Sequence, residues 1–217
     1  MEDVLTEYAR PYDPQRPQVC LDEKIKYLLD SPRPNLPAKA KDGEKAGRVE
    51  KEDYEYERRG SVNLFVMVEP KAGFRHVMVT DQGRACEYAL AIRWLVDVGY
   101  PEALKIILID DNLNTHCAAS LYKTFEPAEA RRLLAKIEQH HTPKHGSWLN
   151  MAEIEISVFE RLCLNRRIAD RETLAREVAA LETERNQAGA KITWQFTCEK
   201  ARVKLHRLYP KLSADLL

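Results

Sequence analysis

The chain has 217 residues, 44% of them hydrophobic and 31% charged, which is enough apolar material for one sizeable core. Thirty-four basic residues balance thirty-four acidic ones, so a strong long-range field that would hold nucleic acid is excluded. No apolar run approaches the roughly 20 residues that a membrane-spanning helix needs, and the N-terminus lacks a secretory signal. We therefore expect a soluble, cytoplasmic protein without membrane contact, whose five scattered cysteines are reduced and mostly buried.

The first part of the chain is rich in proline, which predicts an extended entry rather than long helices. We assign residues 1–16 to a linker and residues 17–188 to a single folded domain. A short apolar run, Val19 to Lys24, indicates a strand that carries Asp22 at its exit. Residues 38–60 are dense in both charges and predict a surface loop.

Later segments alternate between strand and helix patterns. The β-rich runs at 61–69 and 74–80, separated by Pro70 to Gly73, predict a hairpin. Leu104 to Ile109 is nearly all apolar, as expected of a strand buried on both faces in the middle of a mixed sheet. Helical patterns are found at about 84–98, 116–124, 127–139, 150–165 and 170–188, with a short strand near 140–143 and a basic extension at 189–217. This order predicts an α/β fold with a mixed central sheet flanked by helices.

Acidic side chains stand where two of the predicted strands end. Asp22 and Asp111 follow separate strands, and ligands of open α/β sheets gather outside the carboxyl ends of strands. Two carboxylates held close repel each other unless a cation neutralises them, and oxygen ligands suit Mg²⁺. With a third acid, two metal ions could activate a water or a 3′-hydroxyl for phosphoryl displacement. The alternative is that these acids are turn residues and that Asn112 or Asn114 caps a helix.

Glu153 is the candidate for the third acid. Asn150 and Glu153 also have the spacing of a helix N-cap and its capping-box acid, and both roles can coexist. Asp110 and Glu155 are the rival choices. A helical wheel places Glu155 in an apolar stripe and Glu153 on the polar side, which favours Glu153.

Five segments carry a resemblance to a known family. The sequence strongly resembles bacterial transposases of the insertion sequence 630 family, which are related to mariner transposases. The resemblance implies an RNase H-like (ribonuclease H-like) fold and a DDE triad of Asp22, Asp111 and Glu153 that binds two Mg²⁺ or Mn²⁺ ions. It also implies cut-and-paste DNA transposition, with breakage at transposon ends and joining at a TA-containing target. The segments are LDEK (21–24), DYEYER (53–58), DNLNTH (111–116), HTPKHGSWLNMAEIEISV (141–158) and NRRI (165–168).

The resemblance also implies partners. Members of this family normally begin with helix-turn-helix domains that bind the terminal repeats, whereas the first catalytic motif here lies close to Met1. We therefore expect a separately encoded helix-turn-helix half and a homodimer acting on DNA. A basic stretch near the C-terminus is a candidate for local DNA contact or, equally, a solvated helix face. It contains Lys200, Arg202, Lys204, His206, Arg207 and Lys211.

Two other functions are alternatives to transposition. A truncated or domesticated remnant would keep the fold and bind DNA or a partner without activity, but all three acids are intact. A glycosidase with paired carboxylates does not account for the DNLNTH and WLNMAE segments. Histidines 140, 141 and 145 lack zinc-site spacing, so we expect hydrogen-bonding or DNA-facing roles. For Trp148 and Trp194, packing in the core is favoured over stacking on a base.

Overall fold

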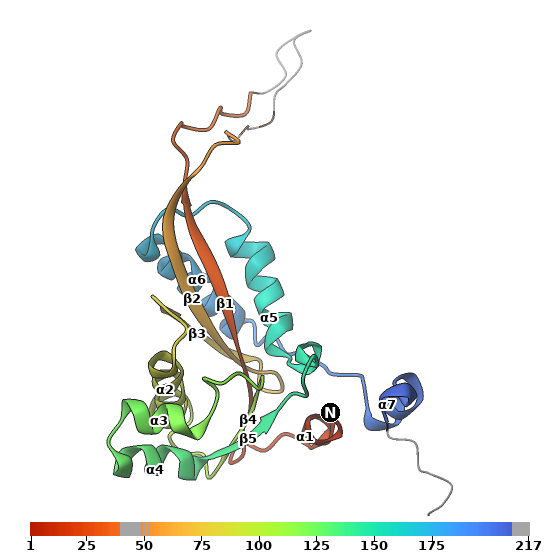
Figure 1. The fold of residues 1–217 in the computed structure, drawn as a ribbon. Helices are drawn as coiled ribbons and strands as arrows, with labels where there is room; N and C mark the ends of the chain where they lie inside the picture. The colour runs from red at the N-terminus through yellow and green to blue at the C-terminus, as the bar shows by residue number, and fades with distance from the viewer. Residues whose placement is uncertain (40–48, 50, 52, 210–217) are drawn as a thin grey trace, which may run out of the picture.

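A five-stranded sheet forms the centre of the computed structural model, which describes residues 1–39, 49, 51 and 53–209 (Figure 1). The spatial order of the strands is β3-β2-β1-β4-β5. The β1-β2 and β2-β3 pairs are antiparallel, whereas β4 runs parallel to both β1 and β5, so the predicted mixed sheet is confirmed. The strands are β1 (Gln18–Asp30), β2 (Glu57–Glu69), β3 (Phe74–Thr80), β4 (Ile106–Asp110) and β5 (Ile137–His141).

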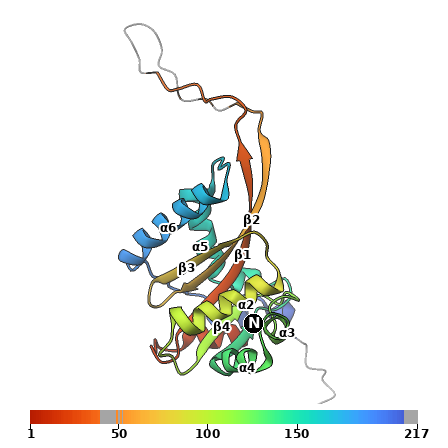
Figure 2. The same cartoon turned by 90° about the vertical axis from the view of Figure 1, so that its left-hand side faces the viewer.

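Helices cover both faces of this sheet. Helices α2, α3 and α4 lie on one side, and α5 and α6 lie on the other (Figure 2). The helices are α1 (Glu2–Ala9), α2 (Ala85–Trp94), α3 (Ala118–Thr124), α4 (Pro127–Lys136), α5 (Ala152–Phe159), α6 (Arg171–Gln187) and α7 (Cys198–Lys204). Single turns of π-helix extend α2 through Gly99 and α5 through Leu164. Among the described helices, none has the length and apolar content needed to cross a membrane.

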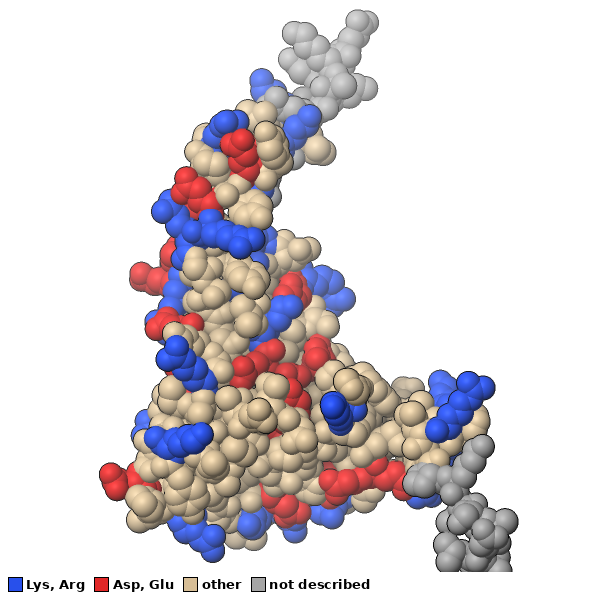
Figure 3. Space-filling model, viewed as in Figure 1, with Lys and Arg blue, Asp and Glu red and all other residues tan. Residues whose placement is uncertain are grey.

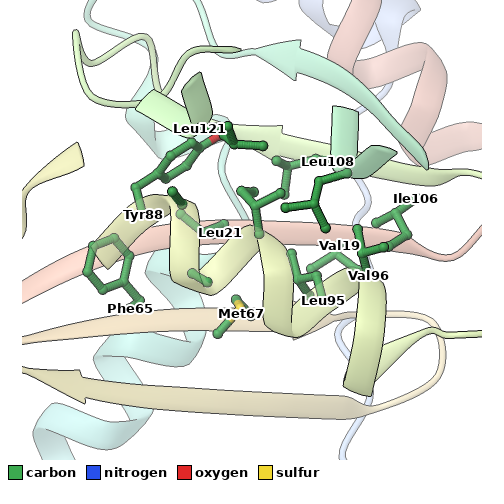
Figure 4. Close-up of a cluster of buried hydrophobic side chains, with 14 of the residues drawn as sticks. Val19, Leu21, Phe65, Met67, Tyr88, Leu95, Val96, Ile106, Leu108 and Leu121 are labelled. Carbon is green, nitrogen blue, oxygen red and sulfur yellow. The ribbon is translucent and has the colours of Figure 1, made fainter. Parts of the chain in front are cut away.

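Alternation along the strands explains why both faces are covered. Side chains in a strand point to opposite faces in turn, and here both sets are apolar. In β1, Val19 and Leu21 pack with α2 in the core cluster of Figure 4, whereas Cys20 packs on the other face against the start of α5. This alternation also sets the position of the site, because the side chain of Asp22 lies on the same face of the sheet as that of Cys20.

Strands β1 and β2 extend further than the sequence predicted. Asp22 lies inside β1 rather than at its exit, because the strand continues to Asp30. The pairing of β1 with β4 covers only Gln18 to Cys20, and beyond it β1 pairs with β2 alone and projects as an arm (Figure 1). Part of the predicted charged loop at 38–60 is strand, since β2 begins at Glu57. Most of the rest of that loop, and Lys211, lie outside the described residues.

The start of the chain is helical, which its proline content did not predict. Helix α1 precedes the first proline, and its Val4, Leu5 and Tyr8 are buried. Arg202 of α7 forms an ion pair with Glu2, which joins the two ends of the described chain. All five cysteines are free, but only Cys20 and Cys163 are buried, so the expectation of mostly buried thiols was wrong.

Candidate active site

The register of the sheet brings Asp22 and Asp111 to the same level. Cys20 of β1 pairs with Ile109 of β4, and each acid lies two residues further along its strand direction. Residues two apart in an extended strand share a face, so Asp22 lies on the side of Cys20, while Asp111 directly follows the end of β4. That side packs against the segment at the start of α5. Glu153 lies in the first turn of α5 and is exposed.

The pKa of Asp22 is affected by the charges of both other acids. The Asp22 side chain is 9% exposed, and burial is the largest cause that raises its pKa, to about 7. The negative charges of Glu153 and Asp111 raise this pKa further, whereas a hydrogen bond from the Glu23 amide lowers it. Acidic side chains gather on this face at the foot of the β1-β2 arm (Figure 3). The sequence therefore folds so that three carboxylates share one locality.

Asn150 joins β1 to the beginning of α5. Its fully buried amide donates to the Leu21 carbonyl at 2.7 Å and to Asp22 Oδ2 at 3.2 Å. The amide oxygen accepts a hydrogen bond from the Ala152 N–H at 3.1 Å. Met151, not Asn150, is the N-cap residue of the helix. The Asn150 side chain therefore fixes the Asp22 carboxylate relative to the helix that carries Glu153.

His116 is buried beside Asp111 and contacts its carboxylate. Nδ1 lies 2.5 Å from Asp111 Oδ1, and Nε2 lies 2.9 Å from Glu23 Oε1. Burial lowers the pKa of His116, but the contacts with Asp111 and Glu23 and the charge of Asp110 outweigh it and raise the pKa to about 10. The ring stacks on Tyr88 with 4.6 Å between centroids. These contacts favour the protonated form of the ring and hold His116 between Asp111 and Glu23.

Asp110, the first rival acid, is occupied elsewhere. Its side chain is fully buried and contacts Tyr88 of α2. Oδ2 accepts hydrogen bonds from the Tyr88 hydroxyl at 2.9 Å and the Gln139 amide at 2.7 Å. Oδ1 lies 2.8 Å from Nδ1 of His141. These partners leave Asp110 directed away from Asp22 and Glu153.

Glu155, the second rival acid, belongs to a buried ion pair. The side chains of Glu155 and Arg75 are both fully buried and lie 3.2 Å apart. Arg185 of α6 contacts Glu155 Oε1 at 2.6 Å and Oε2 at 3.0 Å. Arg75 also donates to the Gly73 carbonyl and to Asn186 Oδ1. The helical wheel therefore separated the two acids as observed, with Glu155 inside and Glu153 outside.

The donor set fits a hard divalent cation. Asp22, Asp111 and Glu153 offer only carboxylate oxygens, and the raised pKa of Asp22 reflects negative charge that a cation would neutralise. Within the described part of the chain, no three His, Cys, Asp or Glu side chains already form a group that could hold a metal ion. Binding an ion here therefore requires side chains to move, including Asp111 away from His116.

Several residues of this site were not predicted as functional. His116 was noted only as part of a motif, and Asn150 only as a helix cap; their partners Glu23 and Asp22 are distant in sequence. Among the other candidates, His140 pairs with Asp3 at 2.7 Å and His141 with Asp110, as hydrogen-bonding roles predict. Trp194 packs with Tyr8 in the core, but Trp148 is 48% exposed, so its core assignment was wrong.

Comparison with known proteins places this geometry in a family. The family model described as DDE superfamily endonuclease matches residues 19–175. No curated protein matches the chain. The fold resembles a pre-cleavage Mos1 transpososome structure with a TM-score of 0.50 and 17% identity over 87% of this chain. A mariner Mos1 paired end complex with Mg gives a TM-score of 0.46 and 15% identity over 89% of this chain and 61% of that one.

These comparisons define what the described domain is. The match to Mos1 covers 56% of the Mos1 chain, so this chain spans little more than half the length of that transposase. The likeness extends to the α/β architecture, a mixed sheet flanked by helices, which is the RNase H-like fold that the sequence predicted. The family model covers most of the present chain, including Asp22, Asp111 and Glu153. The chain therefore belongs to the DDE superfamily endonucleases and has their RNase H-like catalytic fold.

Proposed function

We propose that this chain is the catalytic domain of a cut-and-paste DNA transposase related to the insertion sequence 630 and mariner families. Asp22, Asp111 and Glu153 are its catalytic residues. The observation that carries the proposal is that the charges of Asp111 and Glu153 act on the buried Asp22 carboxyl, whereas both rival acids are committed to other contacts. Membership of the DDE superfamily endonucleases supports the same assignment.

In this proposal the three carboxylates hold two Mg²⁺ or Mn²⁺ ions. The ions would activate a water or a 3′-hydroxyl and stabilise the leaving oxygen during phosphoryl transfer. The fold itself holds the acids in place. Asn150 donates a hydrogen bond to Asp22, and the packing of the start of α5 against the sheet fixes the backbone position of Glu153. His116 neutralises Asp111 before metal arrives. The protein thereby keeps an acidic centre folded without its ions.

The finer reaction and its partners belong to the same proposal. The substrate is DNA, cleaved at transposon ends and joined to a TA-containing target. We propose that the chain acts as a homodimer and that a helix-turn-helix half, such as the resembled family normally has, recognises the terminal repeats. Both expectations come from the family resemblance of the motifs at 111–116 and 141–158.

The test is metal-dependent nicking of supercoiled plasmid. The chain is incubated with Mg²⁺ or Mn²⁺ beside a variant that combines Asp22→Ala, Asp111→Ala and Glu153→Ala. We expect nicking by the wild-type chain alone, while circular dichroism shows that both proteins are folded. Nicking by both would exclude the acid site as its cause. If a folded wild-type chain does not nick plasmid, with or without an added helix-turn-helix half, the result would favour the alternative of a domesticated remnant that binds DNA or a partner.

A further inference from the structure

The loop between β5 and α5 contains a backbone conformation that its sequence does not favour. His145 has φ +63°, and it is the only residue other than glycine with positive φ among those described. The Gly146 N–H donates to the Pro143 carbonyl at 2.7 Å, so His145 is the third residue of a turn. Glycine or asparagine is the usual residue at a turn position with positive φ, because other side chains crowd their own backbone there. A histidine at this position strains the turn.

Nothing within the described fold compensates for this strain. His145 is exposed and makes no hydrogen bond, ion pair or ring contact with any described residue. The other two histidines of the segment differ in this respect, because His140 pairs with Asp3 and His141 with Asp110. Strained residues that the fold does not require are typical of binding sites, where the side chain has a ligand to meet.

The turn forms one wall of a hollow that reaches the acid site. The hollow has a volume of about 330 Å³. Asp111 and Asn112 line it on the β4 side, while Lys144 and His145 line it on the turn side. Leu113, which is 48% exposed, adds an apolar surface. A cation and a hydrogen-bonding ring beside an apolar surface suit a nucleotide, which joins an anionic phosphate to a flat, partly apolar base.

The position of the hollow selects which nucleotide would enter it. A strand cut at the acid site must bring one phosphate to Asp111, and the acids repel its neighbouring phosphates. Metal ions at the acids would offset the charge of the scissile phosphate, and a basic side chain beside the acids would attract the neighbouring phosphate. Lys144 is exposed, and it shares the hollow with Asp111.

We propose that the hollow between Asp111 and the Lys144-His145 turn holds the nucleotide next to the scissile phosphate, with Lys144 and His145 binding its phosphate group. The inference rests on the proposed function and deepens it by assigning a substrate subsite. His145 and Lys144 are binding residues here and take no part in the bond-making step.

Substitution of His145 by glycine separates the effect of the strained backbone from the effect of the side chain on binding. His145→Gly relieves the strained backbone and removes the side chain, so the variant should melt at or above the wild-type temperature. We expect it nevertheless to need about 10-fold more plasmid for half-maximal nicking, with the rate at saturation little changed, because a uniform binding contact is lost. His145→Asn accepts the same backbone and keeps a hydrogen-bond donor, and it should restore part of the loss. Wild-type plasmid dependence for His145→Gly would overturn the inference.

Lys144→Ala tests the phosphate contact without cleavage. Binding of a labelled duplex oligonucleotide is followed by fluorescence anisotropy in the absence of divalent metal at several salt concentrations. The slope of log K against log salt should fall by about one phosphate's contribution, roughly 0.9, in Lys144→Ala. Lys136→Ala, at the opposite end of β5, is the matched control and should keep the wild-type slope.

The two readouts distinguish failure of the inference from failure of the proposed function. A wild-type chain that binds the oligonucleotide but never nicks plasmid contradicts the proposed function. The anisotropy measurement still decides the inference in that case. Equal affinities and slopes for wild type, Lys144→Ala and His145→Gly would overturn it, whereas losses confined to the two turn variants would support it.

Discussion

Glu153 and Glu155 lie two residues apart in α5 and carry the same side chain, yet their surroundings are opposite. Glu155 is fully buried between Arg75 and Arg185, so its charge is neutralised by the fold. Glu153 is exposed, and its charge acts on Asp22 and raises the pKa of that carboxyl. A buried acid that already has cationic partners holds helices together. Neighbouring acids that lack arginine partners can instead bind a cation from outside.

The largest change in stability should appear when each glutamate is replaced by glutamine in a separate variant. Glu155→Gln leaves the buried Arg75 guanidinium without its counter-charge and should lower the free energy of unfolding by about 3 kcal/mol. Glu153→Gln changes an exposed side chain and should alter it by less than about 0.5 kcal/mol. Urea unfolding followed by circular dichroism measures both. Equal losses in the two variants would remove the contrast on which the assignment of Glu153 depends.

Substitution of Asp22 should have a smaller effect and should stabilise the folded chain. Without metal, the folded chain holds this buried carboxyl beside Asp111 and Glu153, which costs stability. Asp22→Asn removes a buried carboxyl that is costly to ionise and should raise the free energy of unfolding by about 1 kcal/mol at neutral pH. Added Mn²⁺ should then stabilise the wild-type chain more than the variant, because the ion binds the folded state.

Thermal melting with and without Mn²⁺ measures both differences, and Asn63→Ala, which removes a contact of Glu23 but leaves the three acids in place, is the control. A destabilised Asp22→Asn chain with the full metal response would show that Asp22 is a structural residue.

The smallest change in stability is expected at Glu69, a buried acid that lies outside the site. Burial raises the pKa of Glu69, and a hydrogen bond with Tyr100 only partly opposes this. A carboxyl with a raised folded-state pKa binds its proton more tightly in the folded chain than in the unfolded chain. The wild-type chain should therefore lose stability as pH rises from the ordinary glutamate range through the raised pKa of Glu69.

Glu69→Gln should lack this loss, so that it exceeds the wild type by less than about 1 kcal/mol at neutral pH and by nothing in acid. Urea unfolding at several pH values measures the difference. A gap that is the same at every pH would assign the effect to packing rather than to charge.

Much of the scaffold could be predicted because its signals are local. The apolar run before Asp110 identified a central strand, and the segment Pro70 to Gly73 between two β-rich runs identified the β2-β3 hairpin. The extension of β1 to Asp30 had no such signal, because it depends on pairing with β2 alone. Helix α1 is stabilised by burial of Val4 and Leu5 in a cluster that includes Ala201, which no local pattern reveals.

The site was predictable in part for the same reason. Motifs and strand positions singled out Asp22, Asp111 and Glu153, and the helical wheel separated Glu153 from Glu155. The contacts that orient these acids join distant parts of the chain. His116 meets Glu23 across 93 positions, and Asn150 meets Asp22 across 128. Residues whose roles arise only from such contacts could not be identified from spacing.

The most direct test of the central claim is to locate bound metal. Crystals of the protein are soaked in Mn²⁺, and anomalous diffraction identifies the ions without assumptions about ligands. We expect anomalous peaks within coordination distance of the Asp22 and Asp111 carboxylates, with Glu153 turned toward them, and no peak at Asp110 or Glu155. Peaks at other acids, in a chain that nicks plasmid when Mn²⁺ is present, would contradict the assignment of Asp22, Asp111 and Glu153 as the catalytic centre.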